Sequence, residues 1–232
     1  MDGIFSSDPR IVENVKKVDP ISHDEMLELA SLGAKVLHNR CVEIGKKYDI
    51  PIIVKSTFEE DSTGTTVREK SEEEAFEDSY ITGVTKDDNV ARITIIGLEN
   101  KIGRTYRVFK LLADQDISVD VIVQSLGEHI TKDIAFTVTK TDLNKTLEIL
   151  DANKEELSAK EILHCDNLSK ISIVGAGMVN NPGIAAKIFE ALYENNINMH
   201  MISTSEIKIS VLVNNNCANM AMKAIHEKFF EK

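Results

Sequence analysis

Two glycine-containing turns are the places where residue types and spacing in this sequence suggest ligand chemistry. Gly103 and Gly183 each lie at the predicted start of a helix, after a short apolar run and a polar turn. Glycine lets a ligand approach the backbone closely, and a helix start offers N–H groups with a partial positive charge. A carboxylate suits such a place, so the turns favour a free amino acid. The alternative is that these glycines only permit a tight turn between strand and helix.

The ammonium group of such a ligand would need hydrogen-bond acceptors. The apolar run that follows each predicted helix ends in polar residues, which could supply them. These residues are Gln124 and Ser125 in the first case, and Ser203, Thr204, Ser205 and Glu206 in the second.

The amino-terminal region carries two cations of interest. Asp8-Pro9-Arg10 is a turn signature with one fixed positive charge, and Lys35 lies in an apolar stretch that predicts a helix. An Arg and a Lys near each other suit a polyphosphate, because Arg binds in a bidentate way and Lys acts as a point charge. The alternative is that Lys35 extends its amine to solvent and Arg10 caps a turn.

Other chemistries have little support. A dinucleotide motif beginning at Gly175 would need Gly at position 180, which is Asn180, and no acidic residue follows at the place that holds a ribose. The six histidines show no metal-ligand spacing, and neither G-x-S-x-G nor a phosphate-binding loop occurs.

The two glycine turns belong to an internal repeat, which is the main feature of the chain. Residues Ile93–Ser125 and Ile171–Ser205 both read as apolar run, polar turn, amphipathic stretch and apolar run. A further strand and helix follow each copy, and Glu161–His164 could close the first unit as a last strand. Ser79–Thr85 could supply the missing strand of the second unit. The order predicts two ferredoxin-like β-α-β-β-α-β units.

The remaining sequence predicts helices and a linker. Ser22–Asn39 reads as an amphipathic helix, and Ser22 with Glu25 forms a capping box. A second helix is expected over Arg40–Tyr48 and a strand over Ile50–Ser56. Residues Glu59–Asp78 form the best linker candidate, because they are rich in turn residues and then in charge.

Composition restricts the class of protein. The net charge of −11 and pI near 5.1 argue against nucleic-acid binding, which needs clustered cations. No basic amphipathic segment suggests binding to a membrane surface, and the apolar runs are too short to cross a bilayer. Three scattered cysteines and an amino terminus unlike a signal peptide favour a reducing cytoplasm.

Several segments resemble aspartokinases. DGIFSSDPRIV, EMLELASLGAKVLH and IPIIVKSTF are similar to the carboxy-terminal part of their kinase domain. ISIVGAGM, NNPGIAAKIFEAL and ISTSEIKISVLV resemble their tandem ACT domains. The resemblance implies an α/β (α+β) protein with a partial amino-acid-kinase domain (1–67), a linker with a donated strand (68–90), and ACT domains over 91–165 and 166–232.

The resemblance also implies site residues. A nucleotide site would include Phe5, Arg10 and Lys35. Effector sites at ACT–ACT interfaces would include, in the first unit, Asn100, Lys101, Ile102, Gly103, Arg104, Thr105, Gln124 and Ser125. In the second unit they would include Asn181, Pro182, Gly183, Ile184, Ala185, Asn198, Met199, Ser205 and Glu206.

The expected function follows from the same resemblance. Aspartokinases transfer the γ-phosphate of ATP to the β-carboxylate of aspartate, which implies ATP and Mg for the intact kinase and no catalytic residue in this chain alone. The amino-terminal half of the kinase is absent, so the chain is expected to be inactive alone and to bind lysine, with threonine as a further candidate. A homodimer paired through ACT domains is also expected.

The sequence departs from the family pattern in its first loop, and two rival interpretations stand beside the resemblance. The family's D-K-P-G loop here reads Asn100-Lys101-Ile102-Gly103, so an anion that could pair with the ammonium of threonine is missing. One rival interpretation is a stand-alone amino-acid-binding ACT protein whose amino-terminal segment is a docking arm. Another is a structural repeat without a ligand, which would require both glycine turns to be blocked.

Overall fold

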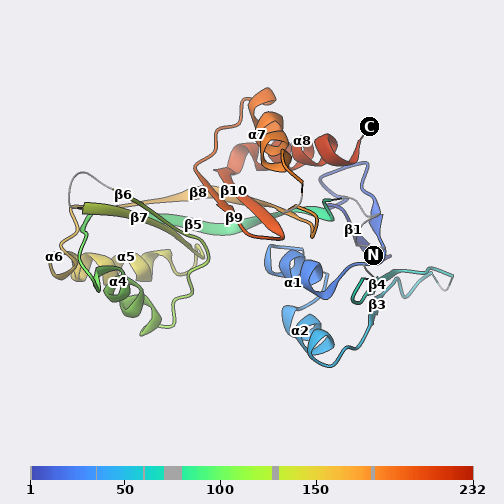
Figure 1. Ribbon diagram of the computed structural model, residues 1–232, viewed down its shortest axis with the longest axis horizontal. Coiled ribbons are helices and arrows are strands. Elements are labelled where there is room, and N and C mark those ends of the chain that lie inside the picture. The colour runs from blue at the N-terminus through green and yellow to red at the C-terminus, as the bar shows by residue number, and fades with distance from the viewer. Residues whose placement is uncertain are drawn as a thin grey trace. The chain divides into compact units, whose positions relative to one another are not determined.

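The computed structural model describes residues 2–34, 36–59, 61–70, 80–126, 131–178 and 181–231. It divides into two compact units, one formed by residues 1–87 with 170–232 and the other by residues 88–169. Strands β5 (Gly83–Glu99) and β8 (Glu161–Val174) contribute residues to both units (Figure 1). The predicted boundaries at residues 67, 90 and 165 stay predictions.

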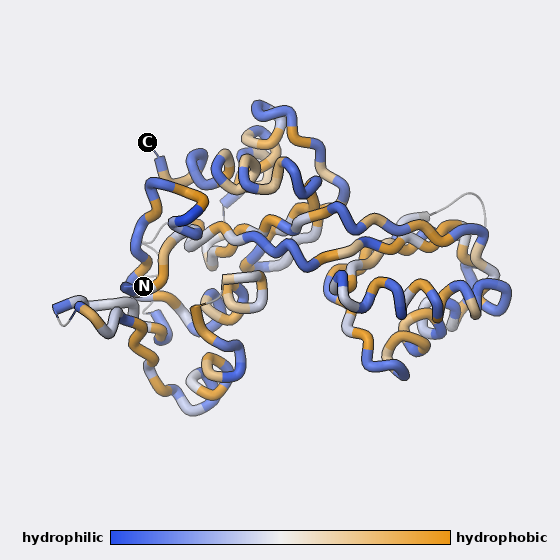
Figure 2. Tube along the Cα trace, turned by 180° about the vertical axis from the view of Figure 1, so that it is seen from behind, coloured by the Kyte–Doolittle hydropathy of each residue, from blue (hydrophilic) through white to orange (hydrophobic). Residues whose placement is uncertain are grey.

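The unit of residues 88–169 is an antiparallel sheet covered by helices. The strand order is β6-β7-β5-β8, with β6 at Ile122–Leu126 and β7 at Thr131–Val138. Helices α4 (Arg104–Ala113) and α5 (Leu143–Ala152) pack on one face, with the short α6 (Lys154–Leu157) beside them. Their apolar residues form a core with those of the sheet that includes Ile93, Ile95, Leu112, Phe136 and Leu150, all buried. Figure 2 shows the hydrophobic stretches along the strands and helices of the chain.

The other unit contains the rest of the same six-stranded sheet. Its strand order is β5-β8-β10-β9, with β9 at Met201–Thr204 and β10 at Lys208–Asn214. Helices α7 (Ile184–Glu194) and α8 (Ala218–Phe230), the latter after a 3-10 turn at Asn215–Cys217, cover one face. Neighbouring residues of a strand point to opposite faces, so Ile173 joins the core under α7 and α8 whereas Val174 joins the core beside α1.

The amino-terminal segment packs against β8 of this sheet, where Val174 joins its core. Its helices are α1 (His23–Ser31) and α2 (Asn39–Lys47). Its short strands pair as β1 (Ile4–Phe5) with β2 (Lys17–Val18) and β3 (Ile52–Val54) with β4 (Thr65–Val67). The predicted capping box is confirmed: the Ser22 hydroxyl accepts the Glu25 amide N–H, and the Glu25 carboxylate accepts the Ser22 amide.

The prediction that the first helix continues to Asn39 is wrong. Helix α1 ends at Ser31, and Gly33 follows with φ +108, a conformation that side-chain-bearing residues rarely adopt. A Cβ at Gly33 would lie 2.4 Å from the Lys86 carbonyl oxygen, so the chain turns here against β5. The segment after Gly33 is irregular, yet it packs Ala34, Val36 and Leu37 against the core. The apolar pattern in the sequence therefore indicated burial, not a helix.

Two further predictions differ from the structure. The strands predicted at Glu161–His164 and at Ile171 are one 14-residue strand, β8, because no Gly or Pro interrupts the segment between them. The predicted linker Glu59–Asp78 contains β4, which pairs with β3 in the register Ile52 to Val67. Residues 71–79 of that linker lie outside the described residues.

Candidate functional site

Helix α4 begins at the Gly103 turn, where there is free space beside the backbone. Gly103 has φ +89, and a Cβ built on it would meet nothing within 4 Å. No side chain caps the first amides of the helix. The turn is therefore not blocked, and its N–H groups suit an anion.

Charged side chains around the Gly103 turn pair with one another. Glu99 lies 2.5 Å from the Lys101 amine and 2.9 Å from the Arg104 guanidinium. These two donors hold the pKa of Glu99 below its ordinary value, with the Lys101 hydrogen bond as the larger cause. Arg104 also donates to the Glu156 carbonyl at 2.6 Å and to the Ser158 hydroxyl at 3.3 Å. The cations nearest this turn thus already have intramolecular partners.

The remaining predicted residues of the first site lie on the surface. The Thr105 hydroxyl is 3.4 Å from Gln124 Oε1, which joins the start of α4 to the exposed strand β6. Ser125 follows on the same strand and is exposed, as are Asn100 and Ile102. The structure therefore brings the predicted loop and Gln124 together.

The Gly183 turn has the same backbone shape with different surroundings. Gly183 has φ +98, a Cβ there would also meet nothing within 4 Å, and no side chain caps α7. The Asn181 side-chain amide donates to the Gly177 carbonyl at 2.7 Å. The Ile184 side chain is 7% exposed and belongs to the core, so only its backbone can face a ligand. Pro182 is exposed and Ala185 is half-buried.

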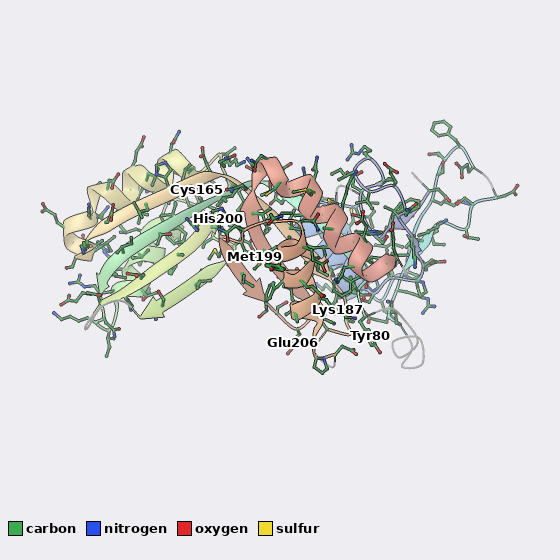
Figure 3. The ribbon with its side chains drawn as sticks, turned by 90° about the horizontal axis from the view of Figure 1, so that it is seen from above. Tyr80, Cys165, Lys187, Met199, His200 and Glu206 are labelled. Carbon is green, nitrogen blue, oxygen red and sulfur yellow. The ribbon has the colours of Figure 1, made fainter. Side chains whose placement is uncertain are left out.

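The carboxyl end of β9 lies at the Gly183 end of the sheet. The Gly175 amide at the end of β8 donates to the Ile207 carbonyl at 3.0 Å, which places the exposed Ser205 and Glu206 beside the loop that leads to Gly183. Figure 3 shows Glu206, Lys187 of α7 and Tyr80 at one edge of this unit, apart from Met199.

Asn198 and Met199 precede β9 and therefore lie at its opposite end. Met199 is half-buried and packs against the core, whereas Asn198 is exposed. The structure does not bring these two residues to the Gly183 turn of the same chain, and their role stays a prediction.

Helix α1 contacts the loop before the Gly183 turn and strand β10. Glu25, 2% exposed, accepts the Ala176 amide at 3.3 Å and the Thr82 hydroxyl at 2.5 Å, and pairs with Lys70 at 3.1 Å. Burial acts to raise the pKa of Glu25, but the Thr82 hydrogen bond and the Lys70 charge together hold it below its ordinary value. One helix turn away, Glu28 pairs with Lys208 of β10 at 2.9 Å.

A pocket of about 120 Å³ lies in the same unit. Its apolar lining comes from several elements and includes Ile4, Phe5, Leu29, Val36, Val84 and Met222. Arg10 lies at the pocket as well, so the structure brings two of the three predicted nucleotide residues together. Lys35 lies outside the described residues, although its neighbour Ala34 lines the pocket.

Asp8 orients Arg10 at this pocket. The Arg10 guanidinium donates to Asp8 from Nε at 3.0 Å and from a terminal nitrogen at 2.7 Å. The Arg10 hydrogen bond holds the pKa of Asp8 below its ordinary value, and the Asp8 carboxylate in turn raises the pKa of Arg10. The Arg10 side chain is 82% exposed, so it can still reach a solvent-side anion.

Metal binding has no support in these residues. Among the described residues no group of three His, Cys, Asp or Glu is arranged to hold an ion, and Cys41, Cys165 and Cys217 form no disulfide. Because Asp8 is paired with Arg10, the pocket does not by itself fit Mg²⁺. In the part of the chain that the structure describes, no helix has the length and apolar character needed to cross a bilayer.

Sequence reasoning missed residues from outside the amino-terminal segment. Met222 and Lys86 line the pocket with Phe5, although they are far apart in the sequence. His226 of α8, fully buried, has Nε2 2.8 Å from the Ser6 hydroxyl next to the pocket, and its burial lowers the pKa of its imidazole. No local motif marks these contacts. Only Asp8 had a local signal, the Asp-Pro-Arg turn.

Comparison with known proteins agrees with this organisation. The ACT domain model matches residues 93–153 and 171–229, and the amino acid kinase family model matches residues 1–56. The aspartokinase of Mycolicibacterium smegmatis is 41% identical over 231 residues, covering 99% of this chain and 55% of that protein. The chain thus spans about half the length of the curated relatives it matches.

Solved structures give the same result. The aspartate kinase of Clostridium acetobutylicum has a TM-score of 0.88 at 29% identity, covering 99% of this chain and 52% of that one. Aspartokinase III of E. coli, in complex with lysine and aspartate, has a TM-score of 0.73 at 26% identity, covering 99% and 50%. The predicted fold class is confirmed. The chain belongs to the ACT-domain family, its amino end matches the amino acid kinase family, and over nearly its whole length it is similar to aspartokinases.

Proposed function

We propose that this chain senses an amino-acid effector at the Gly183 turn, with lysine as the first candidate and threonine as the second. The open turn carries the proposal: its N-cap residue is a glycine, which makes no side-chain hydrogen bond to the helix amides, and a side chain at Gly183 would meet nothing within 4 Å. These amides suit the carboxylate of an amino acid. Exposed Glu206 and Ser205 at the same end of the sheet supply acceptors for an ammonium group.

Lysine is favoured because it carries a second ammonium group. Glu206 is an anion near the turn, so a side-chain ammonium can find a charge partner there. The E. coli aspartokinase III whose fold this chain shares was solved with lysine and aspartate. Feedback by the end product of a pathway would then act through the ACT portion.

In the intact protein we propose aspartate kinase activity. ATP would donate its γ-phosphate to the β-carboxylate of aspartate, in the biosynthesis of lysine, threonine and methionine. Phe5, Arg10 and Lys35 would contact the nucleotide, whereas Mg²⁺ and aspartate would be held by the part of the related aspartokinases that this chain does not span. The chain alone is then inactive. The proposal places it in the cytoplasm, as a homodimer paired through its ACT domains.

An effector can regulate only if it binds two states with different affinity. The contacts of Glu25 with Ala176 and of Glu28 with Lys208 connect the loop before Gly183 and the strand β10 to α1. Leu29 of the same helix lines the pocket. A ligand that moves the loop would therefore act on a wall of the pocket through α1.

Calorimetric titration of the purified chain tests the proposal. Four titrations are made at physiological salt: lysine, threonine, lysine with threonine, and aspartate. Saturable heat with lysine but not with aspartate is the expected result. Absence of heat with both lysine and threonine would refute effector binding by this chain.

The two rival interpretations predict different structural features. A stand-alone ACT protein with a docking arm fits poorly with Val12, which is 3% exposed in the core shared with α7 and α8. Adding the missing kinase half and assaying phosphorylation of aspartate would separate the two. A purely structural repeat requires blocked turns, and neither Gly103 nor Gly183 is blocked.

A further inference from the structure

The pocket that contains Phe5 and Arg10 is completed by residues outside the kinase-matching segment. The amino acid kinase model ends at residue 56, yet Thr85 and Lys86 of β5 and Met222 of α8 also line the pocket. Met222 is 2% exposed and lies within the second ACT match. The regulatory part of the chain therefore forms part of this wall.

The backbone that carries Lys86 is fixed on both sides. The Val84 amide donates to the Ser6 carbonyl at 2.8 Å, and the Thr85 hydroxyl donates to the Leu32 carbonyl at 3.1 Å. The Lys86 amine donates to Asn219 Oδ1 at 2.9 Å, one turn before Met222 on α8. Helix α8 thus supplies an apolar contact and also holds the amine.

The pocket combines an apolar interior with two cations. The Lys86 charge contributes to the lowered pKa of Asp8, so Lys86 lies near the Asp8–Arg10 pair. The pocket of about 120 Å³ is lined mostly by apolar side chains, which suit contact with an aromatic ring. A ligand with an aromatic ring and several negative charges, such as a nucleoside triphosphate, uses both features.

We propose that Lys86 and Met222 contact the nucleotide directly and that Asn219 is a positioning residue for the Lys86 amine. Lys86 meets the phosphates beside Arg10, and Met222 meets the base. This inference rests on the proposed nucleotide role of the pocket. It adds that nucleotide affinity depends on α8, a helix of the regulatory part.

ATP and adenosine are the probes, because adenosine lacks the phosphates. Each ligand is titrated into the full chain. Lys86→Met should lower the affinity for ATP about tenfold, which is the cost of one charge-assisted hydrogen bond. Its affinity for adenosine should be unchanged. Met222→Ala should weaken both ligands by a similar factor. Lys223→Met removes an exposed cation from the same helix and should change neither.

Asn219→Ala should lower the affinity for ATP less than Lys86→Met does and leave the affinity for adenosine unchanged. Asn219→Gln keeps the acceptor oxygen and should restore ATP binding. A merely structural role would weaken both ligands together. The inference is overturned if ATP does not bind the wild-type chain, or if Lys86→Met binds ATP normally or loses adenosine equally. Lysine titration of the same samples reports on the effector proposal separately and shows that each variant is folded.

Discussion

The two glycine turns share a backbone and differ in what surrounds it. Gly103 and Gly183 have φ values of +89 and +98, and both start a helix without a side-chain cap. Around the first turn, Glu99 bridges Lys101 and Arg104. Beside the second, the loop hydrogen-bonds to itself through Asn181 and to buried Glu25 through Ala176.

The repeat gives both turns the same backbone, but their different surroundings predict different functions. The backbone of each turn offers an anion site, but at the first turn neighbouring cations already have carboxylate and carbonyl partners. The second turn is joined to a buried carboxylate on α1, which leads to the pocket. A ligand at the second turn therefore has a route to the rest of its unit, and only that turn is expected to work as a sensor.

The largest expected effect comes from the carboxylate that links the second turn to α1. Glu25→Ala removes a buried carboxylate that pairs with Lys70 and accepts the Thr82 hydroxyl. Loss of one member of a buried pair costs about 3–5 kcal/mol. Urea denaturation should show this decrease in the free energy of unfolding.

Glu99→Ala is the matched control from the first turn. Its carboxylate also accepts hydrogen bonds from two cations, but its side chain is 25% exposed against 2% for Glu25, so the loss of stability should be far smaller. Equal losses of unfolding free energy for the two variants would mean that both turns are equally well packed into their units. That result would contradict the difference described between the two turns.

Valine at each turn glycine tests which turn binds the effector. Both substitutions place a branched side chain at positive φ, so each should destabilise the chain by about 1–2 kcal/mol. Only Gly183→Val should also weaken lysine binding, by more than about tenfold, because its side chain fills the space next to the α7 amides. Calorimetry on both variants measures this. Normal lysine binding by Gly183→Val would move the site elsewhere.

The pH dependence of stability should follow Glu25. Its folded pKa lies below the ordinary value of 4.5, so its ionised form stabilises the fold. That contribution is present above about pH 4.5 and is lost as the pH falls through the folded pKa. Urea midpoints between pH 7 and pH 3 should therefore fall more steeply for wild type than for Glu25→Gln, and parallel curves would contradict this role.

The smallest effect is expected for Glu99→Gln. The substitution weakens a partly exposed carboxylate contact with Lys101 and Arg104, and salt screens such pairs. A slightly lower urea midpoint at low salt should therefore merge with that of wild type in 1 M NaCl. A difference that persists in 1 M salt would show that the first turn depends on this cluster for more than surface charge.

Local sequence was enough for features with short-range causes. Ser22 and Glu25 predicted their capping box because its hydrogen bonds join residues three apart. The two repeats predicted their strands and helices from apolar periodicity, and the helix Arg40–Tyr48 agrees with α2 within one residue at each end. The helix predicted through Asn39 failed because apolar spacing reports burial, and burial also occurs in an irregular segment such as the one after Gly33.

The sequence by itself determined the repeated fold, the two glycine turns and the family. Only the tertiary structure decided that Glu25 spans to Ala176, that Met222 and Lys86 join Phe5 at one pocket, and that Ser205 and Met199 lie at opposite ends of β9. The physical reason is distance along the chain. Caps, turns and amphipathic periods depend on neighbours a few residues away, whereas these contacts join residues that meet only when the sheet and its helices pack.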